Sequence, residues 1–270
     1  MVLDLSQIPV PFRMQPGLRR LDCATLQLTP LVAGSALAAE KRAVFDAGQS
    51  RYSQPGFDAA PALAAIGAHA PAASRFDAAS SAPELVFEED FAVLDGATGT
   101  LPWLCVCVPS HWAPEDKLGL DFTAVHRPVA DNAALLAAGR RLVALATSGA
   151  CWERFVWTVS ASPRYDQHPR RHPRAPWPAT DNAHAFAAAC WLRVERQTFF
   201  PVGQGTRQAV FSIRVMLQPL ADAVRAPGAA RRLHDSLASM SPAALEYKNL
   251  AGARAPLLRW LASLGGDAAP

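Results

Sequence analysis

The stretch Trp191-Leu-Arg-Val-Glu-Arg-Gln-Thr-Phe199 and the later stretch Ala209-Val-Phe-Ser-Ile-Arg-Val-Met-Leu217 decide the fold of this chain. Both are rich in β-branched and aromatic residues and end at turn residues, which is typical of strands. Gly203 and Gly205 lie between them, so the two strands are predicted to form an antiparallel hairpin. Side chains of a strand alternate between its faces. In the first strand, one face therefore carries Trp191, Arg193, Glu195 and Gln197, and the other carries Leu192, Val194, Arg196 and Thr198.

Further strands and helices surround this hairpin. Short apolar runs predict strands at 84–94, 101–108 and 152–160. The spacing of apolar residues predicts helices at 36–52, 59–69, 131–148 and 180–189, with two more within 228–263. The strands cluster in the middle of the chain and do not alternate with helices. The predicted class is therefore α+β, an antiparallel sheet with flanking helices.

The domain organisation follows from the same pattern. Residues 1–83 are expected to form an N-terminal arm and helices that pack on the core, and residues 84–270 the main domain. The arm at 1–35 is extended and marked by proline, and no internal repeat is visible. We expect the two parts to form one structural unit.

Composition bounds the kind of protein. The chain has 270 residues, of which 50% are apolar and 18% charged, so a large core is possible and wholesale disorder is not expected. No apolar run is long enough to span a membrane, and residues 1–13 do not resemble a secretory signal. A formal net charge of +3 is too small to indicate a nucleic-acid partner. The five scattered cysteines are expected to be buried thiols, which suits a cytoplasmic protein.

Several cofactor motifs are absent from the sequence. There is no glycine-rich dinucleotide or phosphate-binding motif, and Cys105-Val-Cys107 lacks the spacing of zinc and redox motifs. No cysteine spacing matches an iron–sulfur cluster. If the protein is a redox protein, it has no recognisable means of holding its own flavin, nicotinamide or cluster.

One candidate functional segment runs from Pro109 to Gly119 and continues to Val129. It contains His126, and a neutral imidazole on a constrained backbone is a good axial ligand for haem iron. Pro128 is expected to hold Arg127 in an extended conformation. The alternative is a structural histidine beside an ordinary loop.

A second candidate is Glu195-Arg196-Gln197-Thr198, in the middle of a predicted strand. Polar side chains there are costly if they are buried without partners. An arginine on a sheet that faces a cofactor could pair with a propionate, and Glu195 could hold an ammonium group. The alternative is the exposed face of a half-solvated strand.

A third candidate is the basic stretch His168-Pro-Arg-Arg-His172. Its prolines argue against a helix, so its histidines are not expected to share a face and bind a metal. A solvated basic loop is expected, whose charge could dock an acidic redox partner.

Several motifs together resemble one known family. They are Pro109-Ser-x-Trp-x-Pro-x-x-Lys-x-Gly119, Val125-His-x-Pro-Val129, and Trp191-Leu-Arg-Val-Glu-Arg-Gln-Thr198 followed by Phe211-Ser-Ile-Arg214. Pro11-Phe-Arg-Met14 and Glu246-Tyr-Lys-Asn-Leu250 add to the resemblance. Together they resemble the haem-dependent oxidative N-demethylase family, in its haem-binding catalytic domain of the dimethylamine monooxygenase type.

The resemblance implies a PAS-like fold that encloses haem b. It also implies oxidative removal of a methyl group from a small secondary amine such as dimethylamine, with O₂ as oxidant and formaldehyde released. Electrons would come from NAD(P)H through a separate flavin and iron–sulfur reductase component. No nucleic acid or membrane partner is implied. The alternative is a PAS-like haem sensor or ligand-binding protein without turnover.

The resemblance and the charge types also assign roles to single residues. His126 would be the axial ligand, and Glu195 would attract the protonated amine. The cofactor would further contact Trp112, Lys117, Arg127, Arg154 and Arg196. The chain departs from the family pattern at Val156, where asparagine is usual, and at Met216, where tyrosine is common.

Overall fold

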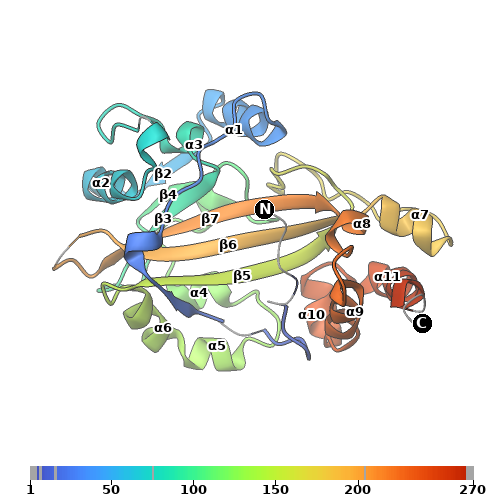
Figure 1. The fold of residues 1–270 in the computed structure, drawn as a ribbon. Coiled ribbons are helices and arrows are strands. Elements are labelled where there is room, and N and C mark those ends of the chain that lie inside the picture. The colour runs from blue at the N-terminus through green and yellow to red at the C-terminus, as the bar shows by residue number, and fades with distance from the viewer. Residues whose placement is uncertain (1–4, 6–7, 15–16, 75, 204, 266–270) are drawn as a thin grey trace.

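The computed structural model describes residues 5, 8–14, 17–74, 76–203 and 205–265; the start of the N-terminal arm, residues 1–4 and 6–7, lies outside them. Within this part of the chain seven strands form one sheet, in the order β1-β5-β6-β7-β3-β4-β2 (Figure 1). All neighbouring strands are antiparallel, which confirms the α+β prediction. The strands are β1 (Arg19–Leu21), β2 (Arg51–Ser53), β3 (Glu89–Asp95), β4 (Trp103–Cys105), β5 (Cys151–Ser160), β6 (Trp191–Pro201) and β7 (Gln208–Pro219).

The predicted hairpin is the centre of the sheet. Strands β6 and β7 pair along their whole length, from Trp191 opposite Pro219 to Pro201 opposite Ala209. This pairing confirms the predicted strands and fixes which side chains share a face. The edge strands β1 and β2, from the first 83 residues, belong to the same sheet.

The helices agree with the sequence in place but less well in length. The α-helices are α1 (Ala36–Asp46), α2 (Ala60–Ala68), α3 (Pro83–Val86), α4 (Phe122–His126), α5 (Ala133–Ala137), α6 (Gly139–Ala146), α7 (Ala183–Ala188), α8 (Leu220–Ala223), α9 (Ala229–Ala238), α10 (Pro242–Tyr247) and α11 (Ala251–Gly265). Short 3₁₀ helices span Cys23–Thr25, Ala72–Ser74 and Pro114–Asp116. The predicted helix at 131–148 is two helices, and the predicted pair within 228–263 is three. Asn249 explains the extra break there, because its left-handed conformation (φ 56°) cannot continue a helix.

The predicted strand at 84–94 begins later than expected. Pro83 starts the short helix α3, since proline is favourable in the first turn of a helix, and β3 begins only at Glu89. No helix among the described residues is both long and apolar enough to cross a membrane.

Different helices cover the two faces of the sheet. One face carries Phe199 and Leu94, which pack against Phe122 of α4 and Val143 of α6; we call it the α4 face. Figure 1 shows α4, α5 and α6 together on this side. The opposite face carries Leu192 and other apolar residues that pack on the C-terminal helices at one end, and on α2 and the N-terminal arm at the other.

Helix α10 lies beside the edge of β5. Strand β1 pairs with β5 only from Cys151 to Glu153, so the rest of this edge has no strand neighbour within the described residues. Lys248, directly after α10, donates from Nζ to the carbonyl of Trp157 at 2.8 Å. This bond satisfies an edge carbonyl and brings the end of α10 next to the α4 face.

The cysteines differ from the sequence expectation. Cys23 and Cys151 form a disulfide, which joins the N-terminal arm to β5. Cys105, Cys107 and Cys190 are buried free thiols, as expected. The prediction of five free thiols is therefore wrong for two of them, because sequence spacing did not reveal that residues 128 positions apart are neighbours.

A buried ion pair joins α1 to β3. The side chain of Lys41 is 0% exposed, and its Nζ lies 3.0 Å from Asp90 Oδ1. The same ammonium donates to the carbonyls of Phe87 at 3.1 Å and Glu89 at 2.7 Å. Asp90 also accepts a bond from the backbone of Val108 at 2.8 Å. The charges are thus desolvated, and Asp90 Oδ1 has the ion pair with Lys41 but no hydrogen bond among the described residues.

Removing the ammonium leaves a buried carboxylate without its counter-charge. We expect Lys41→Met to lower the free energy of unfolding by about 3–5 kcal/mol, measured by urea denaturation. The neighbouring Arg42→Met is the matched control, because the Arg42 side chain is 58% exposed and its ion pair with Asp46 spans 3.7 Å. Equal, small losses for both variants would contradict the assigned role of Lys41.

Candidate functional site

A chain of hydrogen-bonded polar side chains crosses β5 and β6 on the α4 face. Arg154 Nε donates to Gln197 Oε1 at 2.6 Å, and Gln197 Nε2 donates to Glu195 Oε2 at 2.6 Å. The Ser110 hydroxyl donates to Glu195 Oε1 and accepts from Arg193 Nε at 2.7 Å. We call these five residues the Glu195 chain. A carboxylate lies at its centre and a guanidinium at each end.

The Glu195 chain is well enclosed. Arg193 is 1% exposed and Gln197 6%, whereas Glu195 itself is half-buried. Burial lowers the pKa of Arg193 and Arg154, and the charge of Glu195 acts in the opposite sense on both. Each carboxylate oxygen can accept more than one hydrogen bond. Glu195, which is only half-buried, can therefore accept a further hydrogen bond from a ligand.

His126 is the last residue of α4, a helix capped by the side chain of Asp121. Its Nδ1 lies 2.8 Å from the carbonyl oxygen of Phe122, one turn earlier. A carbonyl can only accept, so Nδ1 carries the proton and the lone pair is on Nε2. Burial lowers the pKa of His126 to about 4, and the charges of Arg154 and Lys117 act in the same direction. The imidazole is therefore neutral at neutral pH.

The position of this imidazole depends on a small residue in α6. The His126 ring stacks on Phe122, with centroids 4.1 Å apart. A Cβ atom on Gly139 would come within 2.9 Å of the Phe122 ring. Any larger residue at position 139 would push the Phe122 ring away, and the His126 ring that stacks on it would move as well.

The structure brings four of the predicted site residues to the α4 face: Lys117, His126, Arg154 and Glu195. Arg154 and Lys117 lie near enough to His126 for their charges to affect its pKa, and Arg154 joins Glu195 through Gln197. Lys117 is half-buried, with Nζ 3.5 Å from the carbonyl of Val125.

Trp112 and Arg127 have other surroundings. Trp112 is half-buried and packs on apolar clusters that include Val108 and Leu104. Arg127 is exposed and helical (φ −55°, ψ −37°), so the predicted extended conformation is wrong. Asn132 Nδ2 holds this turn by donating to the carbonyls of His126 at 3.2 Å and Arg127 at 3.0 Å. These bonds outweigh the bias that Pro128 imposes on the residue before it.

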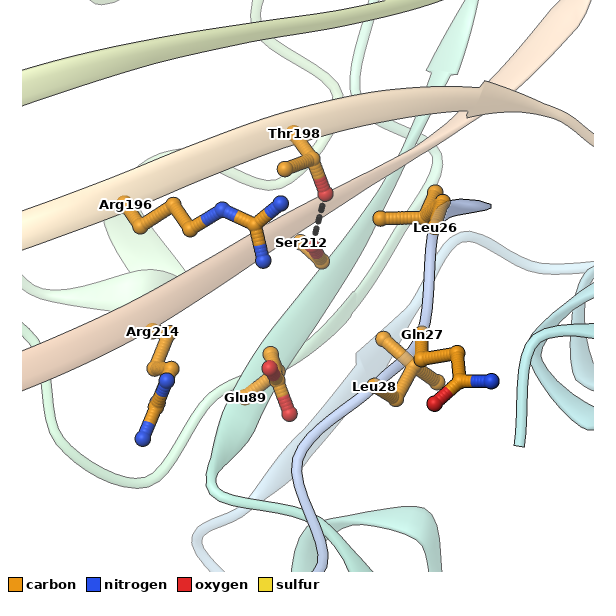
Figure 2. A pocket seen from close by; sticks show the side chains of 8 residues that line it. All are labelled: Leu26, Gln27, Leu28, Glu89, Arg196, Thr198, Ser212 and Arg214. Atoms are coloured by element: carbon orange, nitrogen blue, oxygen red, sulfur yellow. Dashed lines mark hydrogen bonds between the residues drawn. The ribbon is translucent and has the colours of Figure 1, made fainter. Parts of the chain in front are cut away.

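Arg196 lies on the opposite face of the sheet, which corrects the expectation that it shares a site with Glu195. Its Nε lies 3.0 Å from Glu153, a carboxylate that also pairs with Arg19 at 3.1 Å. Figure 2 shows Arg196 beside a small pocket, near the hydrogen bond between Thr198 and Ser212. The N-terminal arm, at residues 26–28, closes this pocket.

The basic stretch from His168 to His172 is solvated only in part, because Pro169 and Arg170 are exposed as expected but His168 is buried. His168 is 2% exposed and its Nε2 lies 3.1 Å from Glu115. Arg170 pairs with Glu115 and Asp116, and Arg171 with Asp166 at 2.8 Å. The described residues contain no group of three or more histidine, cysteine or acidic side chains that could hold a metal ion. The charges of this loop are matched internally and do not form a free basic patch.

A second pocket lies at the end of β5, beside the Glu195 chain. Its cavity volume is about 30 Å³. His111, Gln167 and Lys248 are among its lining residues. His126 lines neither this pocket nor the one in Figure 2.

Comparison with known families adds a further observation. The sequence model of the family described as haem-dependent oxidative N-demethylase, alpha subunit-like, matches residues 77–258. The chain belongs to this family. The match confirms the resemblance drawn from the motifs, and its range contains His126 and the whole Glu195 chain. No curated protein matches the chain.

Within this N-demethylase family member, sequence inspection gave no role to Ser110, Tyr247 or Lys248. Ser110 orients Glu195. Tyr247 and Lys248 lie near enough for the charge of Glu195 to affect their pKa values. Ser110 belongs to the quoted motif at 109–119, and the other two to Glu246-Tyr-Lys-Asn-Leu250. The motifs that contain these three residues were therefore recognised in the sequence, but their proximity to Glu195 is visible only in the folded structure.

The depressed pKa of His126 predicts a pH dependence of stability. An unfolded histidine titrates near 6.5, so the unfolded chain binds a proton that the folded chain does not bind until about pH 4. The stabilising contribution is full above about pH 6.5, falls as the pH drops towards 4, and changes no further below. Between about pH 6.5 and 4, we expect the free energy of unfolding of His126→Gln to fall less than that of the wild type, measured by urea denaturation at a series of pH values. Identical losses would contradict a buried neutral imidazole.

Proposed function

We propose that this chain is the haem-binding oxygenase component for oxidative N-demethylation of a small secondary amine. The observation that carries the proposal is His126. Its protonated Nδ1 is bound to a backbone carbonyl, its Nε2 has no hydrogen-bond partner among the described residues, and it lies within the range of the family match. A neutral imidazole whose other nitrogen donates to a carbonyl is the usual form of a metal-ligating histidine.

The residues around His126 suit haem b. We propose His126 Nε2 as the axial ligand, so a group of three protein ligands is not needed. Arg154 and Lys117 would pair with the propionates as charge-assisted partners, and a role for the exposed Arg127 beside them stays a prediction. Trp112 packs on apolar clusters with Val108 and Leu104, so its contact with the macrocycle stays a prediction. Arg196 is left out, because it is on the opposite face and already pairs with Glu153.

Glu195 is proposed to bind the amine. Ser110 and Gln197 each donate to one of its oxygens, which fixes the plane of the carboxylate. A protonated secondary amine carries a charge that requires a counter-charge in a closed site. Glu195 would accept an N–H hydrogen bond from the amine and hold its nitrogen in one place. It could also take the proton, since the free amine is the more easily oxidised form.

The overall reaction consumes O₂, two electrons and two protons. Bound haem supplies the oxygen chemistry, and the protein supplies position and electrostatics. One oxygen atom enters a methyl C–H bond, and the other leaves as water. The resulting N–CH₂OH group loses its C–N bond to give formaldehyde and the demethylated amine.

The proposal also covers the electron donor, the type of fold and the cellular location. The alpha subunit-like family indicates a multi-component system, and we propose a separate flavin and iron–sulfur reductase as the electron donor. We also propose the PAS-like arrangement, which the antiparallel sheet with helices on both faces supports. A cytoplasmic location stays a prediction, and the Cys23–Cys151 disulfide removes part of its basis.

A haem-binding sensor without turnover is the second candidate. The observation that favours it is Val156, which lies directly opposite Glu195 in the sheet register. The family usually has asparagine at this position, so Glu195 lacks a polar neighbour there. Formaldehyde release on addition of reductase, NAD(P)H and dimethylamine would favour the enzyme; gas binding without amine consumption would favour the sensor.

The axial role of His126 gives the first test. We expect His126→Ala, expressed with haem supply, to lose the wild-type absorption spectrum and to recover much of it with added imidazole. The control is His184→Ala, because His184 is an exposed histidine on α7. A His126→Ala protein with an unchanged haem spectrum would remove His126 from this role.

The two faces of the sheet give the second test. We expect Arg154→Gln to speed haem loss to a haem-scavenging protein by about 10- to 100-fold, the value of one charge-assisted hydrogen bond. Arg154→Lys should restore part of the retention. Arg196→Gln should behave as wild type, since its partner is Glu153 on the opposite face. Faster loss from Arg196→Gln than from Arg154→Gln would contradict the proposed location of the haem.

A further inference from the structure

The pocket at the end of β5 contains a buried acceptor without a donor. Gln167 is 3% exposed, and its Nε2 donates to Ser160 Oγ and to the carbonyl of Arg164, both at 3.2 Å. A carbonyl can only accept, so these bonds fix the orientation of the amide. Gln167 Oε1 then has no hydrogen-bond partner in the part of the chain that the structure describes. A buried unsatisfied acceptor costs about 1–3 kcal/mol, so the pocket favours a ligand with an N–H or O–H group.

The same pocket is cationic. Arg174 lines it and has no ion pair or hydrogen bond among the described residues. Lys248 also lines it, and burial lowers the pKa of Lys248 to about 8, which still leaves most of the ammonium charged at pH 7. No carboxylate is among the described residues that line the pocket. A ligand with a negative charge would therefore be attracted.

The backbone of the pocket is held in place. His111 has a left-handed conformation (φ 59°), which is uncommon outside glycine. Its N–H donates to the carbonyl of Gln167 at 3.2 Å. This bond ties the segment that carries Ser110 to the loop that carries Gln167.

The pocket lies close to the proposed amine site. Ser110, next to His111, bonds to Glu195. Thr158 lines the pocket from β5 and is opposite Arg193, two residues along β6 from Glu195. Two residues of a strand span about 7 Å, which is within the length of a small amino acid and its hydrogen bonds.

We propose that this pocket binds the carboxylate end of the substrate, and that the substrate class is an N-methyl amino acid. Arg174 and Lys248 would bind the carboxylate, Gln167 Oε1 would accept from the ammonium, and Glu195 would hold the same nitrogen from the other side. An ionised haem propionate shares the carboxylate chemistry, but it offers no donor to Gln167. This inference rests on the proposed function and narrows its substrate.

The test compares N-methylglycine with N-methylethylamine, which lacks the carboxylate. Calorimetry with the purified full-length protein, supplied with haem, measures binding, and formaldehyde release with a reductase measures turnover. We expect N-methylglycine to bind at least about 10-fold more tightly. Arg174→Gln should weaken N-methylglycine binding by about 10- to 100-fold, leave N-methylethylamine unchanged, and keep the wild-type haem content. Arg174→Lys should restore part of the affinity.

Arg140→Gln is the matched control, because Arg140 is exposed on α6 and has no ion pair among the described residues. Arg174-dependent binding without turnover would support the pocket and overturn the proposed enzyme. Turnover of simple amines without binding of N-methylglycine would overturn the inference and leave the proposed function standing. Loss of haem from Arg174→Gln, with N-methylglycine binding unchanged, would assign the pocket to a propionate and also overturn the inference.

Discussion

The two-residue period of β6 governs which side chains of this protein can meet. Glu195 and Gln197 point to the α4 face, and Arg196 between them points to the other. Each face thus has its own set of matched charges. On the α4 face, Glu195 lies between Arg154 and Arg193 along one chain of hydrogen bonds. On the opposite face, Arg196 pairs with Glu153. Neighbours in sequence are here separated by the thickness of the sheet.

Much of the fold could be predicted because alternation and turn residues are local signals. The hairpin of β6 and β7 and the α+β class followed from them. The breaks in the predicted helices could not be found in this way. Gly139 starts α6 where the Phe122 ring approaches, and that contact is not visible in the sequence around either residue. The predicted conformation of Arg127 was wrong because the observed one depends on hydrogen bonds from the side chain of Asn132, five residues later.

The candidate site could be predicted by residue type but not by contact. His126 and Glu195 stood out as an imidazole and a carboxylate in unusual sequence contexts. The hydroxyl that orients Glu195 comes from Ser110, 85 positions away. The prediction for the basic stretch at 168–172 failed in part because it took no account of acidic partners from elsewhere in the chain. Arg170 pairs with Glu115 and Asp116, which come from a distant segment, and Arg171 pairs with Asp166 close by in the chain. A run of positive charge in the sequence is therefore no positive surface in the fold.

The contact between His126 Nδ1 and the Phe122 carbonyl lies within one turn of one helix. The choice of tautomer is therefore made locally, as soon as this turn forms, and needs no distant partner. Other parts of the domain can drift in evolution, or shift when a ligand enters, without changing which nitrogen carries the lone pair. The ordering of that ring is settled at folding, so less entropy has to be lost when a ligand binds there.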